Sequence, residues 1–255
     1  MFQHKLEHSP GKLVFLHWYL LSFNGGCINA GGLIAAGRFV SHVTGFATLF
    51  GVHVAHGEIA AAIGISSVPI AFLIGATAAG LLIDRQIHLG KKPHYDYVMF
   101  GSAACLGFSA LAGLFGKFPN FGQNFPQQPS YLLLVLLCLA SGLQNAAITS
   151  SSGSSVRTTH LTGITTDLGL GIARRITLKG EDPRSKKENE ANLLRIGTII
   201  SFACGSGVSA WLFSNFGYLA FILPTTIAIY SAFHGRSLKI THTRFNPVDW
   251  VGSEN

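Results

Sequence analysis

The sequence predicts an all-α integral membrane protein with six transmembrane helices in two inverted three-helix repeats, whose first and fourth helices are broken. Three observations lead to this fold class. Only 11% of the 255 residues are charged, less than half of the roughly 25% typical of soluble domains. The apolar residues fall in long blocks, each close to the about 20 residues that cross a bilayer. A polar segment of eleven residues also occurs twice, once after the first block and once after the fourth.

The apolar blocks define the order of the predicted spans. Four of them suit one crossing each, at about 13–36, 61–83, 97–116 and 131–156. The uncharged stretch 196–233 is too long for one crossing and suits two, with a turn at 214–217. We therefore treat 1–255 as a single membrane domain, with repeats at about 13–116 and 131–233.

The positively charged residues lie between the apolar blocks and indicate the orientation. With six spans, sixteen of the eighteen Lys and Arg residues fall on one side, and only Arg38 and Lys117 fall on the other. The positive-inside rule then predicts that both termini are cytoplasmic. The same distribution accounts for the formal charge of +7 through contacts with lipid headgroups, so no nucleic-acid partner is expected.

The duplicated segment runs from Ser41 to Gly51 and again from Thr159 to Gly169, and both copies contain His-x-Thr-Gly. An Asn and an Arg upstream of it repeat at nearly the same spacing, as Asn29 with Asn145 and Arg38 with Arg157. Each half has three spans, an odd number, so the second copy enters the membrane from the opposite side. Inverted repeats are common among transporters, whose solute sites lie near the midplane where helices are interrupted.

The chemistry of the two segments favours an anion site. Glycines in the first span and serines after the fourth favour unwinding beside the motifs, although close helix packing through small residues is the alternative. A short helix should restart after each motif, with Thr44 and Thr162 as N-caps. Such helix ends offer N–H groups and partial positive charge to a carboxylate or another anion. The candidate substrate-binding residues are Asn29, Arg38, Ser41, His42, Thr44, Asn145, Arg157, His160, Thr162, Thr166 and Asp167.

Structural roles remain open for the same side chains. Both arginines could extend to lipid headgroups at the end of a span, and each His could instead lock the backbone of its own motif. Asp167 stands where the first copy has Leu49. Its carboxylate could bind a coupling proton or cation, or it could pair on the surface with Arg174 or Arg175.

The sequence favours neither a metal nor a cofactor. His53, His56 and Glu58 have helical spacing, but the other half has no counterpart to them. Nucleotide-binding and hydrolase motifs are absent. The four cysteines lie in apolar segments without a C-x-x-C pair, and we interpret them as small buried hydrophobic residues.

The two motif regions resemble the YoaK-like family, bacterial inner-membrane proteins grouped under a domain of unknown function. The resemblance is carried by Asn29-Ala30-Gly31-Gly32 with Gly37 to Gly45, and by Gly142-Leu143-Gln144-Asn145-Ala146 with Val156 to Gly163. It covers about residues 13–234. It implies a six-helix protein of the bacterial plasma (inner) membrane and implies no activity.

Three kinds of function remain open. A small secondary transporter or permease for an anionic or zwitterionic solute, bound between the two motifs, fits the duplication best. A membrane-embedded enzyme acting on a lipid or isoprenoid would use His160 and Asp167 as acid and base. A structural or regulatory subunit would instead hold both histidines in backbone contacts. The expected partners are membrane lipids and a small solute, with a homo-oligomer as an open alternative.

Overall fold

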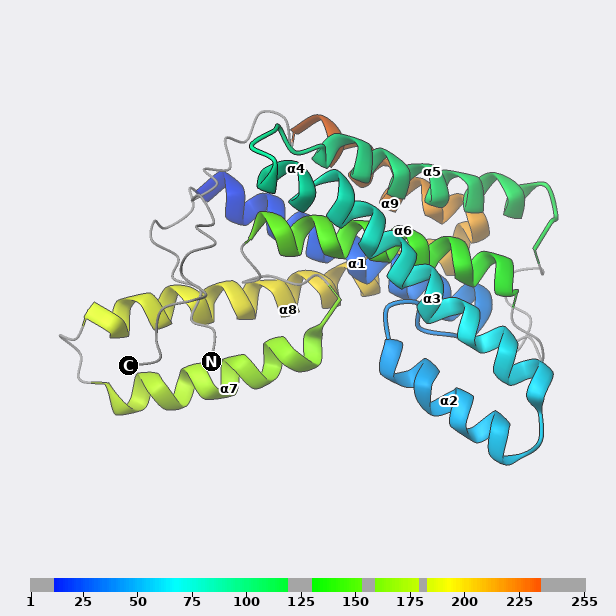
Figure 1. The fold of residues 1–255 in the computed structure, drawn as a ribbon, viewed down its shortest axis with the longest axis horizontal. Helices are drawn as coiled ribbons and strands as arrows, with labels where there is room; N and C mark the ends of the chain where they lie inside the picture. The colour runs from blue at the N-terminus through cyan, green and yellow to red at the C-terminus, as the bar shows by residue number, and fades with distance from the viewer. Residues whose placement is uncertain (1–11, 119–129, 153–158, 179–182, 235–255) are drawn as a thin grey trace.

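The computed structural model describes residues 12–118, 130–152, 159–178 and 183–234, and this part of the chain is helical with short connections (Figure 1). Its elements are α1 (Lys12–Ala36), α2 (Val43–Ala55), α3 (Ile59–Leu82), α4 (Asp84–His88), α5 (Tyr95–Leu114), α6 (Tyr131–Ser151), α7 (Leu161–Thr177), α8 (Pro183–Phe216), the 3₁₀ helix η1 (Gly217–Phe221) and α9 (Ile222–His234). The all-α prediction is therefore confirmed for the described residues.

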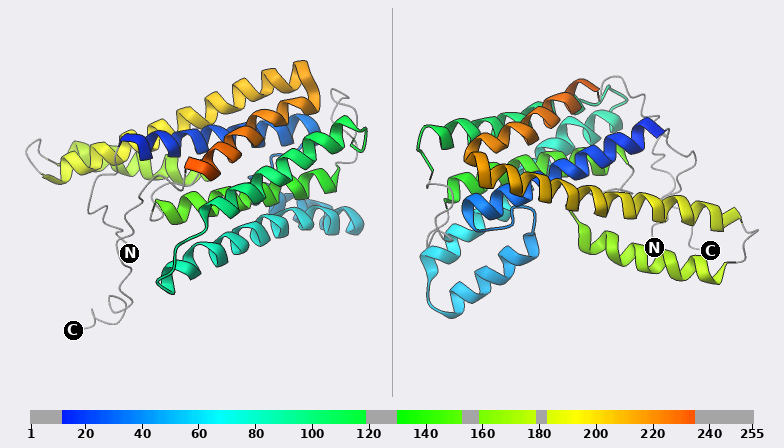
Figure 2. Two further views of the ribbon diagram at one scale, coloured as in Figure 1. Left: turned by 90° about the horizontal axis from the view of Figure 1, so that it is seen from above. Right: turned by 180° about the vertical axis from the view of Figure 1, so that it is seen from behind.

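Four helical segments of the described chain are long and apolar enough to cross a membrane. They are Ile59–His88, Tyr95–Leu114, Tyr131–Ser151 and Arg184–His234. The last segment contains both α8 and α9, and the chain reverses between them at η1, close to the predicted turn (Figure 2). The 25-residue α1 is long enough to span but carries polar residues along its length, including His17, Asn24 and Asn29.

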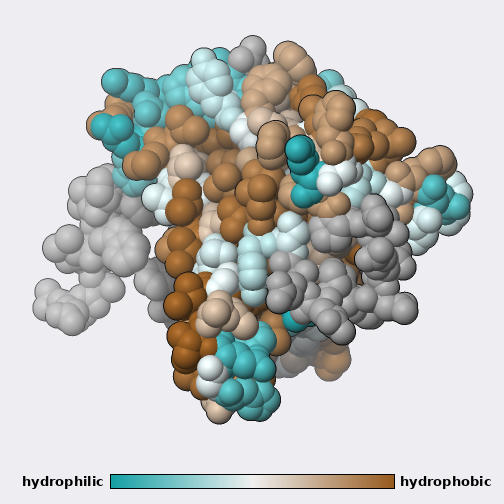
Figure 3. Space-filling view, turned by 90° about the vertical axis from the view of Figure 1, so that its right-hand side faces the viewer, coloured by the Kyte–Doolittle hydropathy of each residue, from teal (hydrophilic) through white to brown (hydrophobic). Residues whose placement is uncertain are grey.

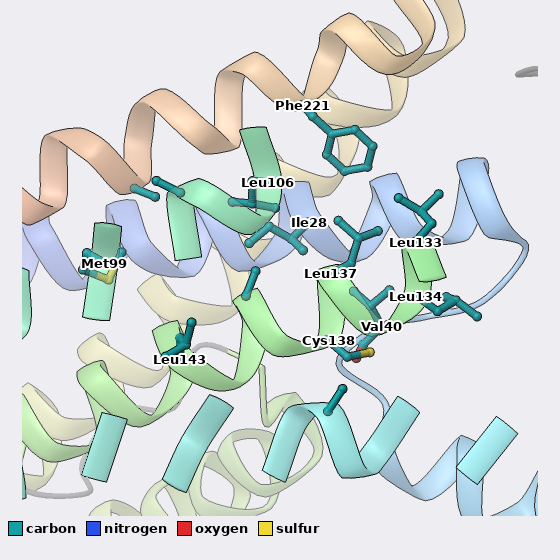
Figure 4. Close-up of a cluster of buried hydrophobic side chains, with 14 of the residues drawn as sticks. Ile28, Val40, Met99, Leu106, Leu133, Leu134, Leu137, Cys138, Leu143 and Phe221 are labelled. Carbon is teal, nitrogen blue, oxygen red and sulfur yellow. The ribbon is translucent and has the colours of Figure 1, made fainter. Parts of the chain in front are cut away.

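Helices of one half pack mainly on helices of the other half. The two most extensive helix interfaces join α1 to α8 and α3 to α6, while α5 packs on both α6 and α9. Buried apolar side chains fill the centre of this bundle, among them Ile28, Leu106, Leu137 and Phe221 (Figure 4). On the outside, hydrophobic residues form broad patches with hydrophilic residues in separate groups (Figure 3).

Two glycines bring the backbones of α1 and α8 together. A Cβ on Gly26 would collide with the carbonyl oxygen of Phe202, and a Cβ on Gly205 would collide with that of Phe23. The small residues also allow hydrogen bonds between the helices, since the Ser206 hydroxyl donates to the Gly26 carbonyl oxygen at 3.2 Å. This is the close approach that small residues permit in membrane helices.

The interface between α3 and α6 is built in the same way. A Cβ on Gly142 would collide with the carbonyl oxygen of Phe72, and a Cβ on Gly75 would lie 2.5 Å from that of Leu139. Gly142 and Leu139 follow Gly26 and Phe23 by 116 positions, the spacing that separates Asn29 from Asn145. Each half therefore uses equivalent residues to contact the other half.

The prediction that the first and fourth helices are broken is wrong within the helices themselves. α1 runs without interruption through Gly25, Gly26, Gly31 and Gly32, and α6 runs to Ser151. The glycines lower intrinsic helix stability, but at the crossings they make room for a neighbouring backbone. The chain leaves α1 only at Gly37, whose φ of 67° suits glycine. Most of the serine run after α6, residues 153–158, lies outside the described residues.

The cysteines are only partly as predicted. Cys27 and Cys138 are buried, Cys105 is intermediate, and Cys204 is exposed, which corrects the expectation that all four are buried. Cys204 lies on an apolar stretch of α8 whose outer side chains include the exposed Ile200 and Val208. An apolar segment predicts contact with lipid as readily as contact with the protein interior, so composition does not distinguish these two positions.

Candidate functional site

The two repeated motifs each lead into a short helix. α2 begins directly after His42 and packs on α3, and α7 begins directly after His160 and packs on α8. The prediction of a helix restarting after each motif is confirmed. Figures 1 and 2 show that α2 and α7 lie toward opposite ends of the bundle, with their N-terminal ends pointing toward each other.

The start of α2 lies well inside the length of α3. α2 has 13 residues, about 20 Å at 1.5 Å per residue. The chain then turns through Gly57, where φ is 74°, and returns along α2 as α3. The start of α2 is therefore level with about Ala71, near the middle of the 24-residue α3.

The start of α7 has a comparable position along α8. The two helices are antiparallel, and Gly171 of α7 lies against Asn192 and Arg195 of α8. Leu161, ten residues before Gly171, is therefore level with about Phe202. Phe202 is the residue at which α8 crosses α1, so both short helices begin at the depth of a helix crossing.

The N-caps are His42 and His160, which corrects the prediction of Thr44 and Thr162. Their φ and ψ angles are nearly the same, −102° and 70° for His42 and −103° and 57° for His160, and neither side chain makes a capping hydrogen bond. Each Thr lies at the second helical position, where its carbonyl accepts a hydrogen bond. The Thr48 hydroxyl donates to Thr44 and the Thr166 hydroxyl donates to Thr162, both at 3.0 Å.

The glycine of each motif makes room for the histidine ring. A Cβ on Gly45 would lie 2.9 Å from His42 Nδ1, and a Cβ on Gly163 would collide with the ring of His160. Both imidazoles therefore fold over the first turn of the following helix, and both residues are exposed in the described chain. Neither helix has a side-chain cap, so no capping side chain offsets the partial positive charge of its first turn.

A hydrogen bond from the leading helix holds each motif. Asn29 Oδ1 accepts from the Ser41 amide at 3.3 Å and from the Ser41 hydroxyl at 3.0 Å. In the second half, Asn145 Oδ1 accepts from the Thr159 amide at 3.4 Å. These two asparagines position the motifs, and their side-chain oxygens are already engaged by the protein.

The connection before the first motif has two further contacts. Arg38 is partly buried, and its Nη1 donates to the Gly37 carbonyl at 2.9 Å. Its Nε is buried without a hydrogen-bond partner in the described chain. Cys138 of α6, which the sequence analysis did not select, has its Sγ 2.8 Å from the Val40 carbonyl oxygen and so ties α6 to this connection (Figure 4). The equivalent Arg157 lies outside the described residues.

Asp167 does not pair with either of the arginines expected as surface partners. Arg174 Nη1 lies 3.7 Å from Glu188 and Arg175 Nε donates to Asn189 at 3.0 Å, both on α8. Asp167 is exposed, and no interaction joins it to another described residue. It also lies seven residues beyond His160 on α7, about 10 Å along the axis, which does not favour a shared acid–base pair.

The described part of the chain contains no cluster of three or more metal-ligating side chains. His53 Nδ1 lies 2.5 Å from Glu58 Oε2 at the end of α2. This pair joins the end of α2 to the residue that precedes α3, so it has a local structural role.

The helical bundle, the four candidate membrane-spanning segments and the repeated motif define a class of helical protein that is compatible with a membrane location. A family model described as "Protein of unknown function (DUF1275)" matches residues 17–234, and the chain belongs to this family, as the resemblance to YoaK-like proteins predicted. No curated protein and no solved structure matches the chain.

Proposed function

We propose that this protein is a small secondary transporter or permease of the bacterial inner membrane, which binds an anionic or zwitterionic solute between its two His-x-Thr-Gly motifs. One observation carries the proposal: α2 and α7 begin part-way along α3 and α8, with their N-terminal ends pointing toward each other. Two helix starts that face each other concentrate partial positive charge and N–H donors in one place. Transporters with inverted repeats bind solutes in this way at interrupted helices.

The equivalent contacts of the two halves support a pseudo-symmetric transporter of six spans. One half would span with α1, α3 and α5, and the other with α6, α8 and α9. The glycine crossings, the asparagine hydrogen bonds and the Thr–Thr contacts occur in both halves. The cytoplasmic side would be the end from which α1 starts and at which α9 ends, because the loops there carry most of the Lys and Arg residues.

Within this proposal the motif residues have different roles. His42 and His160 would contact the anionic group beside the first-turn amides, and Arg38 would add a fixed positive charge. Arg157 would do the same in the second half. Asn29, Ser41 and Asn145 would position the motifs and not contact the solute. The exposed Asp167 has no equivalent in the first half and is the candidate for a coupling proton or cation.

The test measures thermal unfolding of the purified full-length protein in the presence of small carboxylates, amino acids and phosphate, followed by uptake into proteoliposomes. The expected result is that at least one solute raises the melting temperature of the wild type and that His42→Ala and His160→Ala each remove this shift. His56→Ala is the matched control, because His56 is exposed at the far end of α2. The proposal fails if the stabilising solutes act equally on the wild type and on both motif variants, or if no solute is taken up.

A further inference from the structure

A buried pair of amide side chains lies where the two leading helices meet. Asn24 of α1 and Gln144 of α6 are 0% and 1% exposed. Asn24 Nδ2 donates to Gln144 Oε1 at 2.6 Å, and Gln144 Nε2 donates to the Leu21 carbonyl oxygen at 2.9 Å. The remaining oxygen, Asn24 Oδ1, is buried and has no hydrogen-bond partner in the described chain.

The symmetry-related positions of α1 and α6 carry no such pair. By the spacing of 116 residues that relates α1 to α6, Asn24 corresponds to Ala140 and Gln144 corresponds to Ile28. Both counterparts are 0% exposed. Each of α1 and α6 therefore buries an apolar side chain at the position where the other helix buries an amide, so amides are not required to fill such a space.

The pair lies next to the motif-holding asparagines along both helices. Gln144 immediately precedes Asn145, and Asn24 lies five residues before Asn29 on α1. Asn29 and Asn145 hold the residues that precede the two N-cap histidines. Along the helix axes, Gln144 is thus one residue from Asn145, and Asn24 is about 7.5 Å from Asn29.

A buried acceptor without a partner is unfavourable, and such groups call for a water, an ion or a ligand. An amide oxygen accepts hydrogen bonds and does not attract an anion, so it complements the positively charged helix starts. A solute that engaged both would carry a negative group at one end and an N–H or O–H donor at the other.

We propose that Asn24 Oδ1 accepts a hydrogen bond from the solute, with Gln144 holding the Asn24 side chain in place. This inference rests on the proposed function and narrows its substrate class to small amino-acid-like or hydroxy-acid-like anions. An ordered water could supply the same donor, and the experiment separates these two sources.

The experiment compares glycine, glycolate and acetate as probes of the full-length protein in detergent, by thermal unfolding and calorimetry. All three probes carry a carboxylate, but only glycine and glycolate carry a donor. The expected result is that glycine or glycolate binds the wild type about tenfold more tightly than acetate, which corresponds to a difference in binding free energy of about 1.4 kcal/mol. Equal affinities for the three probes, or binding of none of them, would overturn the proposal; equal affinities are also the result expected if a water occupies the acceptor.

A double variant tests the role of the pair by introducing the residue types found at the symmetry-related positions, Ala140 and Ile28. Asn24→Ala/Gln144→Ile should bind glycine, glycolate and acetate equally, each with the affinity that the wild type has for acetate. Its melting temperature should stay within a few degrees of the wild type, because apolar residues are already buried at the symmetry-related positions of α1 and α6. Retained discrimination between glycine and acetate in this variant would overturn the proposal. If the double variant does not fold, Asn24→Leu, which has a similar shape and no hydrogen-bond acceptor, is measured in its place with the same expected loss of discrimination.

The two proposals fail in different ways. The variants His42→Ala and His160→Ala test the anion site. If neither variant binds any probe, a preference for glycine over acetate cannot be measured in them. The wild type could bind acetate through the motif histidines without preferring glycine or glycolate. That result would support the transporter proposal and overturn the proposed role of Asn24.

Discussion

The ring of His160 occupies the space that a Cβ on Gly163 would need, and the ring of His42 stands in the same relation to Gly45. Glycine at the third helical position is therefore part of how each histidine is oriented. A larger residue would force the imidazole away from the first turn. The imidazole is the group proposed to contact the solute, so solute binding would be lost.

The first prediction concerns these motif glycines. Gly163→Ala should remove solute-induced stabilisation and lower the melting temperature, because the new methyl group collides with the His160 ring. Gly169→Ala is the matched control, since a Cβ there meets nothing within 4 Å. In a helix interior that control should stabilise the protein by up to about 1 kcal/mol. If Gly163→Ala and Gly169→Ala had the same melting temperature, the geometry described for His160 would be contradicted.

The second prediction concerns the crossing of α1 and α8. Gly205→Ala should destabilise the protein by about 1–3 kcal/mol, the usual effect of overpacking, because the added methyl group meets the backbone of Phe23. Gly207→Ala, two residues further along α8, has open space at its Cβ and should be neutral or stabilising. Unfolding by heat or denaturant in one detergent measures both, and equal stabilities would show that the helices do not approach at Gly205.

The third prediction concerns the asparagine that holds the first motif. Asn29→Ala should cost about 1 kcal/mol per lost hydrogen bond and should speed hydrogen exchange at the Ser41 amide. Asn29→Asp keeps an acceptor oxygen for the same amide and is expected to preserve slow exchange. If Asn29→Ala leaves exchange at Ser41 unchanged, the contact between Asn29 and Ser41 does not stabilise the motif.

The fourth prediction concerns Glu188 of α8, which pairs with Arg195 on the same helix and lies 3.7 Å from Arg174 of α7. Arg195 Nη1 lies 2.8 Å from Glu188 Oε1 and also donates to Asn192 at 2.6 Å, and the side chains of Arg195 and Glu188 are only 19% and 16% exposed. Glu188→Gln should therefore destabilise the helix pair by about 1–3 kcal/mol, because a largely buried Arg loses its charged partner. Proteolysis within α7 provides the measurement.

The control for this cluster is Glu190→Gln, which removes an exposed charge two residues further along α8. It should change the proteolysis rate little, since most exposed substitutions fall within about 0.5 kcal/mol. Raising the salt concentration should narrow the difference between the wild type and Glu188→Gln only slightly, because partly buried ion pairs are screened less than exposed ones. A large effect of Glu190→Gln on the proteolysis rate would indicate that overall charge, and not the specific Glu188–Arg195 pair, stabilises the helices.

Much of the fold could be predicted because it depends on local properties of the chain. Long apolar blocks predict the main helices within a few residues, and Gly217 with its neighbours predicts the reversal between α8 and α9. The helix after each motif follows from the spacing of Ile164, Leu168 and Ile172. Its first residue was harder to predict, because His is not a preferred N-cap and Thr is.

The roles that could not be predicted depend on contacts between distant segments. Gly26 is both a weak helix former and a good packing residue, and only the presence of Phe202 beside it decides between these effects. Arg174 and Arg175 find their partners on α8, across the 179–182 connection, and not on their own helix.

The Asn24–Gln144 pair was missed for a different reason. Neither residue belongs to the duplicated motif, and the apolar residues around them give no periodic signal. The informative comparison is with Ala140 and Ile28, the residues that differ at equivalent positions in the other half. A search for differences between the halves, in addition to similarities, would have found this pair.

The interlocked packing of the halves has a consequence for biosynthesis. α1 is made first, but its most extensive interface is with α8, and the contact of Cys27 with Gly205 joins residues 178 positions apart. During translation, α1 must wait for most of the polypeptide before its glycine face and its buried amide find their partners. Neither half expressed alone should mature into a stable product, whereas the two halves produced together from separate genes should assemble.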